Sequence, residues 1–249
     1  MKQIRKKKHP IFNGFKGFLK IFKRKPKTLY LGEKPTEPCI VLSNHVGSSG
    51  PLTYELFADY QFRFWGTYEM NGDFKTLYKY LSKTFYHEKL HMPLWLARIW
   101  CVIAAPVAKG FYKGLELIST YTDMRFWGTL KESIETLQNG KSLIIFPEDS
   151  SIGYFDKMTH FFSGFIVLAK QALIKGLNLP IYITYFSKKH KTILYDKPIL
   201  CSELLSTGET KEEIAERFLA RSNYLGEQIG KMVKEEKKAK KEKKSKKNG

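Results

Sequence analysis

Short apolar runs and longer amphipathic stretches alternate along the middle of this 249-residue chain. A short apolar run is typical of a strand inside a sheet, because both of its faces are covered. Such runs occur at residues 39–43, 62–67, 142–146 and 181–185. Between them, residues 123–138 and 161–175 have the apolar spacing of helices. The alternation predicts an α/β domain with a mixed or mostly parallel sheet flanked by helices.

The segment before the first apolar run has a helical pattern. Ile11, Phe15, Phe18 and Phe22 recur every three or four positions, and lysines occupy the other faces. This spacing predicts an amphipathic helix with an aromatic face and a cationic rim. Such a helix either lies on an anionic bilayer or packs on the domain, and both alternatives stay open.

The longest apolar stretch, residues 93–108, is interrupted by Arg98. It is shorter than the roughly 18 to 20 uninterrupted apolar residues that span a bilayer. We therefore expect a buried core helix, with a segment dipping into the membrane interface as the alternative.

Positive charge is concentrated at the two ends of the chain. The formal net charge is +19. Residues 1–28 carry eleven Lys or Arg and no acid, and residues 231–249 carry ten Lys against three Glu, so the residues between are nearly neutral. Basic ends predict attraction to an anionic membrane surface. The tail lacks the arginines and aromatics of a nucleic-acid reader, so no specific nucleic acid is expected as a partner.

These patterns divide the chain into three parts. Residues 1–36 are expected to form a basic amphipathic membrane-surface segment, residues 37–230 a single α/β domain, and residues 231–249 a Lys-rich disordered tail. The three cysteines are widely separated and suggest neither a disulfide framework nor a metal site. The expected location is cytoplasmic, peripheral on the inner face of the cell membrane.

Two loops at strand ends contain the candidate chemistry. SNHVGSSGP, residues 43–51, follows the first apolar run and provides His45. FPEDSS, residues 146–151, follows the third run and provides Glu148 and Asp149. Because the carboxyl ends of parallel strands lie along one edge of a sheet, the two loops are expected to meet there.

With their surroundings, these loops resemble sequence blocks of the glycerolipid acyltransferase family, typified by 1-acylglycerol-3-phosphate acyltransferases. SNHVGSSGP is similar to the family's N-H-x-x-x-x-D loop, and NGKSLIIFPEDSS is similar to its G-x-x-x-x-I-F-P-E-G-T-R-S block. Further on, FSGFIVLA and LPIYI resemble the helix and the apolar strand that follow in the family. The resemblance covers residues 38–200 and implies the family's α/β fold.

The resemblance also implies an O-acyltransferase with no cofactor, in which His45 is the general base. The histidine would take a proton from an acceptor hydroxyl as that oxygen attacks an acyl thioester, while backbone N–H groups stabilise the oxyanion. The donor would be acyl-CoA or an acyl-carrier protein, and the acceptor a lysophospholipid or another lipid or glycan. The expected substrate-binding residues are Asn44, Ser48, Ser49, Gly50, Pro147, Ser150, Ser151 and Arg125.

The family's aspartate, five residues after its histidine, falls at Gly50 in this chain. A histidine base needs a hydrogen-bond partner that fixes its tautomer and orientation. Asp149, which stands where the family has glycine, or Glu148 is expected to provide that partner as a catalytic acid. Glu55 and Glu69 are weaker candidates.

The family's phosphate-binding arginine falls at Ser151, so glycerol phosphate need not be the acceptor unless a nearby cation replaces it. The candidate cations are Lys109, Lys113 and Arg125. A second hypothesis is a catalytically degenerate lipid-binding protein with the acyltransferase fold. A third is a zinc hydrolase, because residues 87–91 match H-E-x-x-H. Pro93 disfavours a helix through that motif, so no metal is expected.

Overall fold

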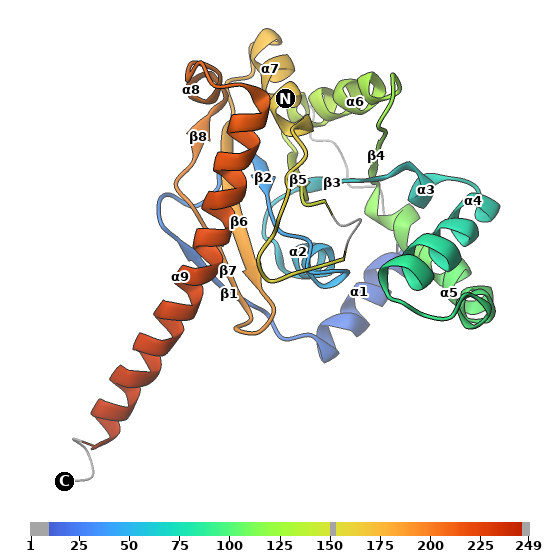
Figure 1. The fold of residues 1–249 in the computed structure, drawn as a ribbon, viewed down its shortest axis with the longest axis horizontal. Coiled ribbons are helices and arrows are strands. Elements are labelled where there is room, and N and C mark those ends of the chain that lie inside the picture. Colours follow the sequence, from blue (N-terminus) through green and yellow to red (C-terminus); the bar gives the residue numbers. More distant parts are fainter. Residues whose placement is uncertain (1–9, 150–152, 246–249) are drawn as a thin grey trace.

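A mixed, mostly parallel sheet forms the centre of the computed structural model, which describes residues 10–149 and 153–245 (Figure 1). The strand order is β1-β7-β6-β2-β5-β3-β4, and β8 also pairs with β6. The strands from β6 to β4 run parallel, whereas β7 and β8 run antiparallel to β6. The strands are β1 (Lys27–Tyr30), β2 (Ile40–Leu42), β3 (Phe62–Thr67), β4 (Ile118–Thr120), β5 (Ser142–Ile145), β6 (Pro180–Ser187), β7 (Thr192–Tyr195) and β8 (Ile199–Leu200).

The predicted fold class and all four predicted strands are confirmed. Buried side chains alternate between the two faces of the sheet, as the period of two in a strand requires. Leu42 of β2 is in register with Ile145 of β5, and both face one core. Val41 and Ile144, one position earlier, face the other core. Both faces are apolar because helices cover each of them.

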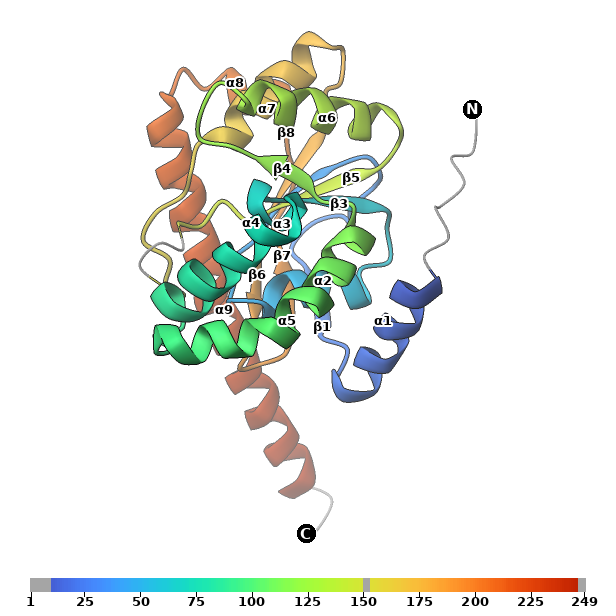
Figure 2. The same cartoon turned by 90° about the vertical axis from the view of Figure 1, so that its right-hand side faces the viewer.

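Helices α6, α7 and α9 cover one face of the sheet, and α2 covers the other (Figures 1 and 2). A lobe made of α3, α4, the π-helix η1 and α5 stands beside β3 and β4 (Figure 1). The two predicted helices are confirmed as α6 and α7, each three residues shorter at its start. The helices are α1 (Pro10–Phe22), α2 (Ser49–Phe57), α3 (Tyr68–Asn71), α4 (Phe74–Lys79), η1 (Tyr80–Lys89), α5 (Leu94–Leu115), α6 (Phe126–Gln138), α7 (Gly164–Ile174), α8 (Cys201–Leu205) and α9 (Lys211–Ser245).

The N-terminal segment combines a helix with a strand. The predicted helix is present as α1. After it, β1 pairs in parallel with β7, with Leu29 opposite Leu194. Part of the expected membrane-surface segment, residues 1–36, therefore belongs to the sheet.

The C-terminal part differs from the predicted disordered tail, because α9 continues to Ser245. Its first half is fixed by burial of residues such as Phe218 and Leu225 against the sheet. Residues 234–244 are lysines, glutamates and one alanine, which have high helix propensity. The helix therefore continues beyond the part that packs on the sheet. Lys27 of β1 also pairs with Glu236 of α9 at 3.2 Å.

The apolar stretch predicted to be a buried core helix is α5, and that prediction is wrong. Only small residues of α5 are fully buried, namely Ala97, Cys101 and Ala105, which face the rest of the lobe. Many of its large apolar residues, such as Trp95 and Ile103, are exposed, because no other described segment covers that side of the lobe. Within the described residues, α5 is long and apolar enough to cross a membrane by length and composition.

Candidate functional site

The two predicted loops meet at the carboxyl ends of β2 and β5. Leu42 pairs with Ile145 at the end of these strands, and the Ser43 N–H donates to the Ile145 carbonyl at 3.0 Å. Beyond this pair, the backbone N–H of His45 donates to Oε2 of Glu148 at 2.8 Å. The structure thus brings the histidine and the acid together although they lie 103 residues apart.

The imidazole of His45 is held by a backbone carbonyl. Its Nδ1 forms a short hydrogen bond with the carbonyl oxygen of Gly47. Because a carbonyl only accepts, Nδ1 carries the proton and Nε2 keeps its lone pair. The ring lies between the aromatic rings of Phe146 and Tyr154, with centroid distances of 5.0 and 5.1 Å. The hydrogen bond fixes the tautomer of the imidazole, and the hydrogen bond and the two ring contacts together fix its orientation.

Burial lowers the pKa of His45 to about 4. The hydrogen bond to the Gly47 carbonyl favours the protonated ring and opposes this shift, while the positive charge of Lys89 adds to it. The imidazole is therefore neutral at every pH well above 4. A neutral imidazole with an unprotonated Nε2 is the form that a general base requires.

The turn after β2 depends on backbone conformations that most residues avoid. Val46 and Gly47 have φ values of 47° and 61°, so two successive residues are left-handed. This turn directs the Gly47 carbonyl back to the histidine ring. The Gly50 N–H then donates to the His45 carbonyl at 3.1 Å. A Cβ at Gly50 would lie 2.4 Å from that oxygen, so no side chain fits there.

The candidate acids have other tasks than holding the His45 ring. Glu148 is buried and accepts from the backbone of His45; burial raises the pKa of its carboxyl, and that hydrogen bond lowers it. The negative charge of Asp149 acts on Lys89, where it opposes the burial that lowers the pKa of the ammonium. The expectation that a carboxylate holds Nδ1 is therefore corrected, because the Gly47 carbonyl holds it.

The two weaker acid candidates are engaged elsewhere. Glu55 pairs with Lys16 of α1 at 2.7 Å. Glu69 accepts a short hydrogen bond from the hydroxyl of Thr67.

Asn44 was expected to bind substrate, but it has a structural role. Its Nδ2 donates to the Phe186 carbonyl at 3.0 Å, and the Phe186 N–H donates to its Oδ1 at 2.7 Å. These two buried hydrogen bonds tie the end of β2 to β6 and so fix the position of the backbone at the next residue, His45.

The other predicted binding residues are distributed around the loops. Pro147 is buried, and its carbonyl accepts from the Phe162 N–H at 2.8 Å. Ser48 is exposed and precedes α2, while Ser49 begins that helix and is partly exposed. Ser150 and Ser151 lie outside the described residues.

Arg125 follows β4 at the same edge of the sheet. It pairs with Asp123 at 2.6 Å and lies over the rings of Tyr121 and Tyr68 at 4.4 and 5.1 Å. Three strand spacings separate β4 from β2, which places the start of this loop about 14 Å from the end of β2. Arg125 is therefore displaced from His45 along the sheet edge.

The two candidate lysines belong to α5. Lys113 lies in its last turn, and Lys109 donates to the Gly72 carbonyl.

The H-E-x-x-H match does not form a helical pair of histidines. The π-helix ends at Lys89, and His91 has a φ of 55°. His87 instead forms a hydrogen bond through Nδ1 with the Met92 carbonyl at 2.8 Å. The described residues contain no group of three or more His, Cys, Asp or Glu placed to hold a metal ion.

Sequence reasoning missed two side chains beside His45. Tyr154 lies against the imidazole, and Lys89 lies 5.9 Å from the Tyr154 ring centroid. Neither residue has a motif that identifies it. Lys89 lies inside the H-E-x-x-H match at residues 87–91, in which it has no role as a metal ligand.

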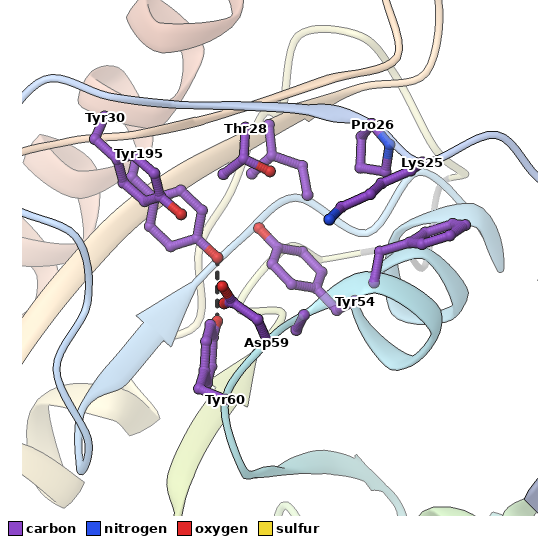
Figure 3. A pocket seen from close by; sticks show the side chains of 11 residues that line it. Lys25, Pro26, Thr28, Tyr30, Tyr54, Asp59, Tyr60 and Tyr195 are labelled. Atoms are coloured by element: carbon purple, nitrogen blue, oxygen red, sulfur yellow. Dashed lines mark hydrogen bonds between the residues drawn. The ribbon is translucent and has the colours of Figure 1, made fainter.

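A tyrosine-lined cavity lies between α2 and strands β1 and β7 (Figure 3). Its volume is about 230 Å³. Tyr60 and Tyr195 join their hydroxyls across it at 3.1 Å. The Tyr54 hydroxyl reaches Ser43 at 3.1 Å and Thr184 at 2.8 Å. This network connects α2 to the strand ends that carry the site.

Substitutions at Gly50 test whether this position requires glycine for steric reasons or only lacks the family's aspartate. Gly50→Asp would restore the family's aspartate in sequence, yet its Cβ would collide with the His45 carbonyl. We expect Gly50→Asp and Gly50→Ala both to lower the free energy of unfolding, by about 1–3 kcal/mol as overpacked sites do. Urea denaturation measures this effect.

The matched control is Ser49→Asp, which introduces the same acid one residue earlier, in the first turn of α2. An acid there is compatible with the helix dipole, so stability should stay close to wild type. Wild-type stability of Gly50→Ala would contradict the steric account.

Comparison with known proteins gives a likeness of fold. No family model matches the chain, and no curated protein matches it in sequence. Among solved structures, it is similar to the 1-acyl-sn-glycerophosphate (LPA) acyltransferase PlsC from Thermotoga maritima. The two are 13% identical, with a TM-score of 0.45, over 90% of this chain and 89% of the other. The functional proposal therefore depends on the residues of this chain.

Proposed function

We propose that this protein is an O-acyltransferase that moves a fatty acyl group from an acyl thioester to a hydroxyl, with His45 as the general base. The observation that carries the proposal is the hydrogen bond from the His45 backbone to Glu148. It joins SNHVGSSGP, which resembles the family's histidine loop, to NGKSLIIFPEDSS, the block with the strongest resemblance. The neutral ring with Nδ1 protonated supports the same role.

In the proposed reaction, Nε2 of His45 accepts the proton of the acceptor hydroxyl. The hydroxyl oxygen forms a bond to the thioester carbonyl carbon, whose oxygen becomes an oxyanion. The carbonyl then reforms as the carbon–sulfur bond breaks, and the departing sulfur takes the proton from the imidazolium. The products are an ester and a free thiol, and the enzyme returns to its starting state.

The Gly47 carbonyl affects this cycle when Nε2 gains a proton and the ring becomes positively charged. Its dipole stabilises that charge and partly offsets the burial that lowers the pKa of His45, but it does so less than a carboxylate would. Proton transfer to the proposed base is therefore harder than in an enzyme whose histidine is held by aspartate. Glu148 contributes by fixing the backbone from which the ring projects.

The proposed donor is acyl-CoA or an acyl-carrier protein. The proposed acceptor is a hydroxyl of a lysophospholipid or of another lipid or glycan. Arg125 is already paired with Asp123, so recognition of an acceptor phosphate would require that pair to open or rearrange.

Replacing the proposed base tests the function directly. His45→Ala should lower kcat by about 10²- to 10⁴-fold, the usual contribution of general-base catalysis. Release of free thiol from acyl-CoA in the presence of a mixed lipid panel measures the rate.

His87→Ala is the control, because His87 is also partly buried but belongs to the π-helix. It should retain the wild-type rate. Thiol release that His45→Ala leaves unchanged would exclude His45 from catalysis, and absence of transfer by the wild type would favour a lipid-binding protein with a degenerate site.

The low pKa of His45 predicts the pH profile of the reaction. The base is active when neutral, so activity should persist as the pH falls below the ordinary histidine value of 6.5 and decline only as it approaches the folded pKa of about 4. The pH dependence of kcat/KM, measured where the fold remains intact by circular dichroism, tests this expectation. An acid limb centred near 6.5 would show that the ring is not desolvated as the structure indicates.

A further inference from the structure

Helix α5 presents a large apolar surface that no part of the described protein covers. Its inner side is made of small buried residues, whereas its outer side exposes long aliphatic and aromatic side chains. Trp95, Ile99 and Ile103 are 65%, 62% and 69% exposed. Exposed apolar area concentrated on one helix marks an interaction site. The outward residues of α5 are Trp95, Leu96, Ile99, Trp100, Val102, Ile103 and Val107.

Helix α1 joins this surface, since it packs directly on the last turns of α5. The Phe12 ring lies 5.4 Å from that of Phe111, and the Phe15 ring lies 5.8 Å from it. Phe12 also occupies the space beside Gly114, where a Cβ would come within 2.3 Å of its ring. The contact therefore requires a glycine on α5, and α1 and α5 lie side by side at one end of the molecule (Figures 1 and 2).

The exposed residues of α1 extend the apolar surface and surround it with positive charge. Phe18, Ile21 and Phe22 are more than half exposed, and Lys20 and Lys23 are exposed beside them. Apolar side chains with tryptophans, bordered by lysines, match the chemistry of an anionic bilayer: acyl chains accept the apolar groups, and lipid phosphates attract the lysines.

The helix is held in a way that favours lying in the bilayer surface over crossing it. Ala97, Cys101 and Ala105 are completely buried against η1 and α4. A transmembrane path would pull these residues away from the lobe. One side of α5 therefore belongs to the protein, and the other is available to lipid.

The same lobe borders the site. Lys89, the last residue of η1, lies over the Tyr154 ring, which in turn lies against His45. Tyr112, a partly buried residue of α5, packs against the same apolar core as Phe146. The lobe that holds α5 therefore also contacts the site.

From these observations, we infer that the outer faces of α1 and α5 form one docking surface for an anionic lipid bilayer, with α5 lying in the plane of the interface. Docking there would place the enzyme peripherally on a membrane and present lipid to the lobe beside His45. The inference concerns binding and needs no turnover, so it stands or falls independently of acyl transfer.

The experiment is binding of the full chain to vesicles of phosphatidylglycerol and phosphatidylcholine, measured by flotation. Wild type should bind, and a double variant, Ile99→Glu with Ile103→Glu, should bind at least tenfold more weakly. Ile174→Glu is the matched control, because Ile174 is 63% exposed but lies on α7, which packs with α6 away from α5. It should bind as wild type does.

A second measurement does not depend on introduced charges. Lipids brominated near the headgroup should quench wild-type tryptophan fluorescence, and the quenching should be lost in Trp95→Phe with Trp100→Phe. That variant keeps Trp127, which is 56% exposed on α6 and serves as an internal control.

Three results would overturn the inference. The first is equal vesicle binding by wild type and the double glutamate variant. The second is quenching that persists without Trp95 and Trp100. The third is a wild-type protein that does not bind vesicles but forms a dimer in solution, where the double glutamate variant is a monomer. This result would assign the surface to a second copy of the chain.

Discussion

The candidate site depends on a turn that has no room for a side chain at Gly50. In this turn, the N–H of Gly50 returns to the His45 carbonyl, and a Cβ would approach the same oxygen to 2.4 Å. The two left-handed residues before it, Val46 and Gly47, direct a carbonyl to the imidazole. Gly50, where the sequence block that this loop resembles has an aspartate, is thus fixed by a backbone constraint, and the Gly47 carbonyl holds the histidine ring.

The sheet supplies the rest of the geometry. Parallel pairing of β2 with β5 brings Glu148 to the backbone of His45, and the buried amide of Asn44 ties the same strand end to β6. These interactions position the residue, and a carbonyl, not a carboxylate, holds Nδ1 of the ring. The result is a histidine with a low pKa. Burial lowers the pKa, and the hydrogen bond to the Gly47 carbonyl is the main effect that opposes this lowering. In the proposed reaction, catalysis comes from position and desolvation more than from a strong base.

Much of this architecture could be predicted from sequence. Strands such as residues 62–67 are readable because their apolar runs are short and buried on both faces, and loops at parallel strand ends necessarily share one edge. The partner of His45 was not predictable, because a carbonyl belongs to every residue and only the φ angles of Val46 and Gly47 aim this one. Nδ1 is therefore held by a carbonyl and not by the predicted acid.

Tertiary context explains the other differences. The composition of residues 93–108 suits a core helix and a membrane-facing helix equally, and only the three-dimensional structure shows that the large side chains of α5 point outward. The tail after residue 230 was assigned to disorder from its charge, but its helix propensity extends α9 once Phe218 has anchored the helix on the sheet. Charge and composition describe a segment alone, whereas these outcomes depend on its neighbours.

The central claim is that the Gly47 carbonyl holds His45 with its Nδ1 protonated and its Nε2 unprotonated. Long-range proton–nitrogen NMR of the ¹⁵N-histidine-labelled full chain at neutral pH tests this most directly, with His45→Ala identifying the resonance. The account predicts a neutral His45 ring with a protonated Nδ1 and an unprotonated Nε2. A ring protonated at Nε2, or one that exchanges between both tautomers, would contradict it.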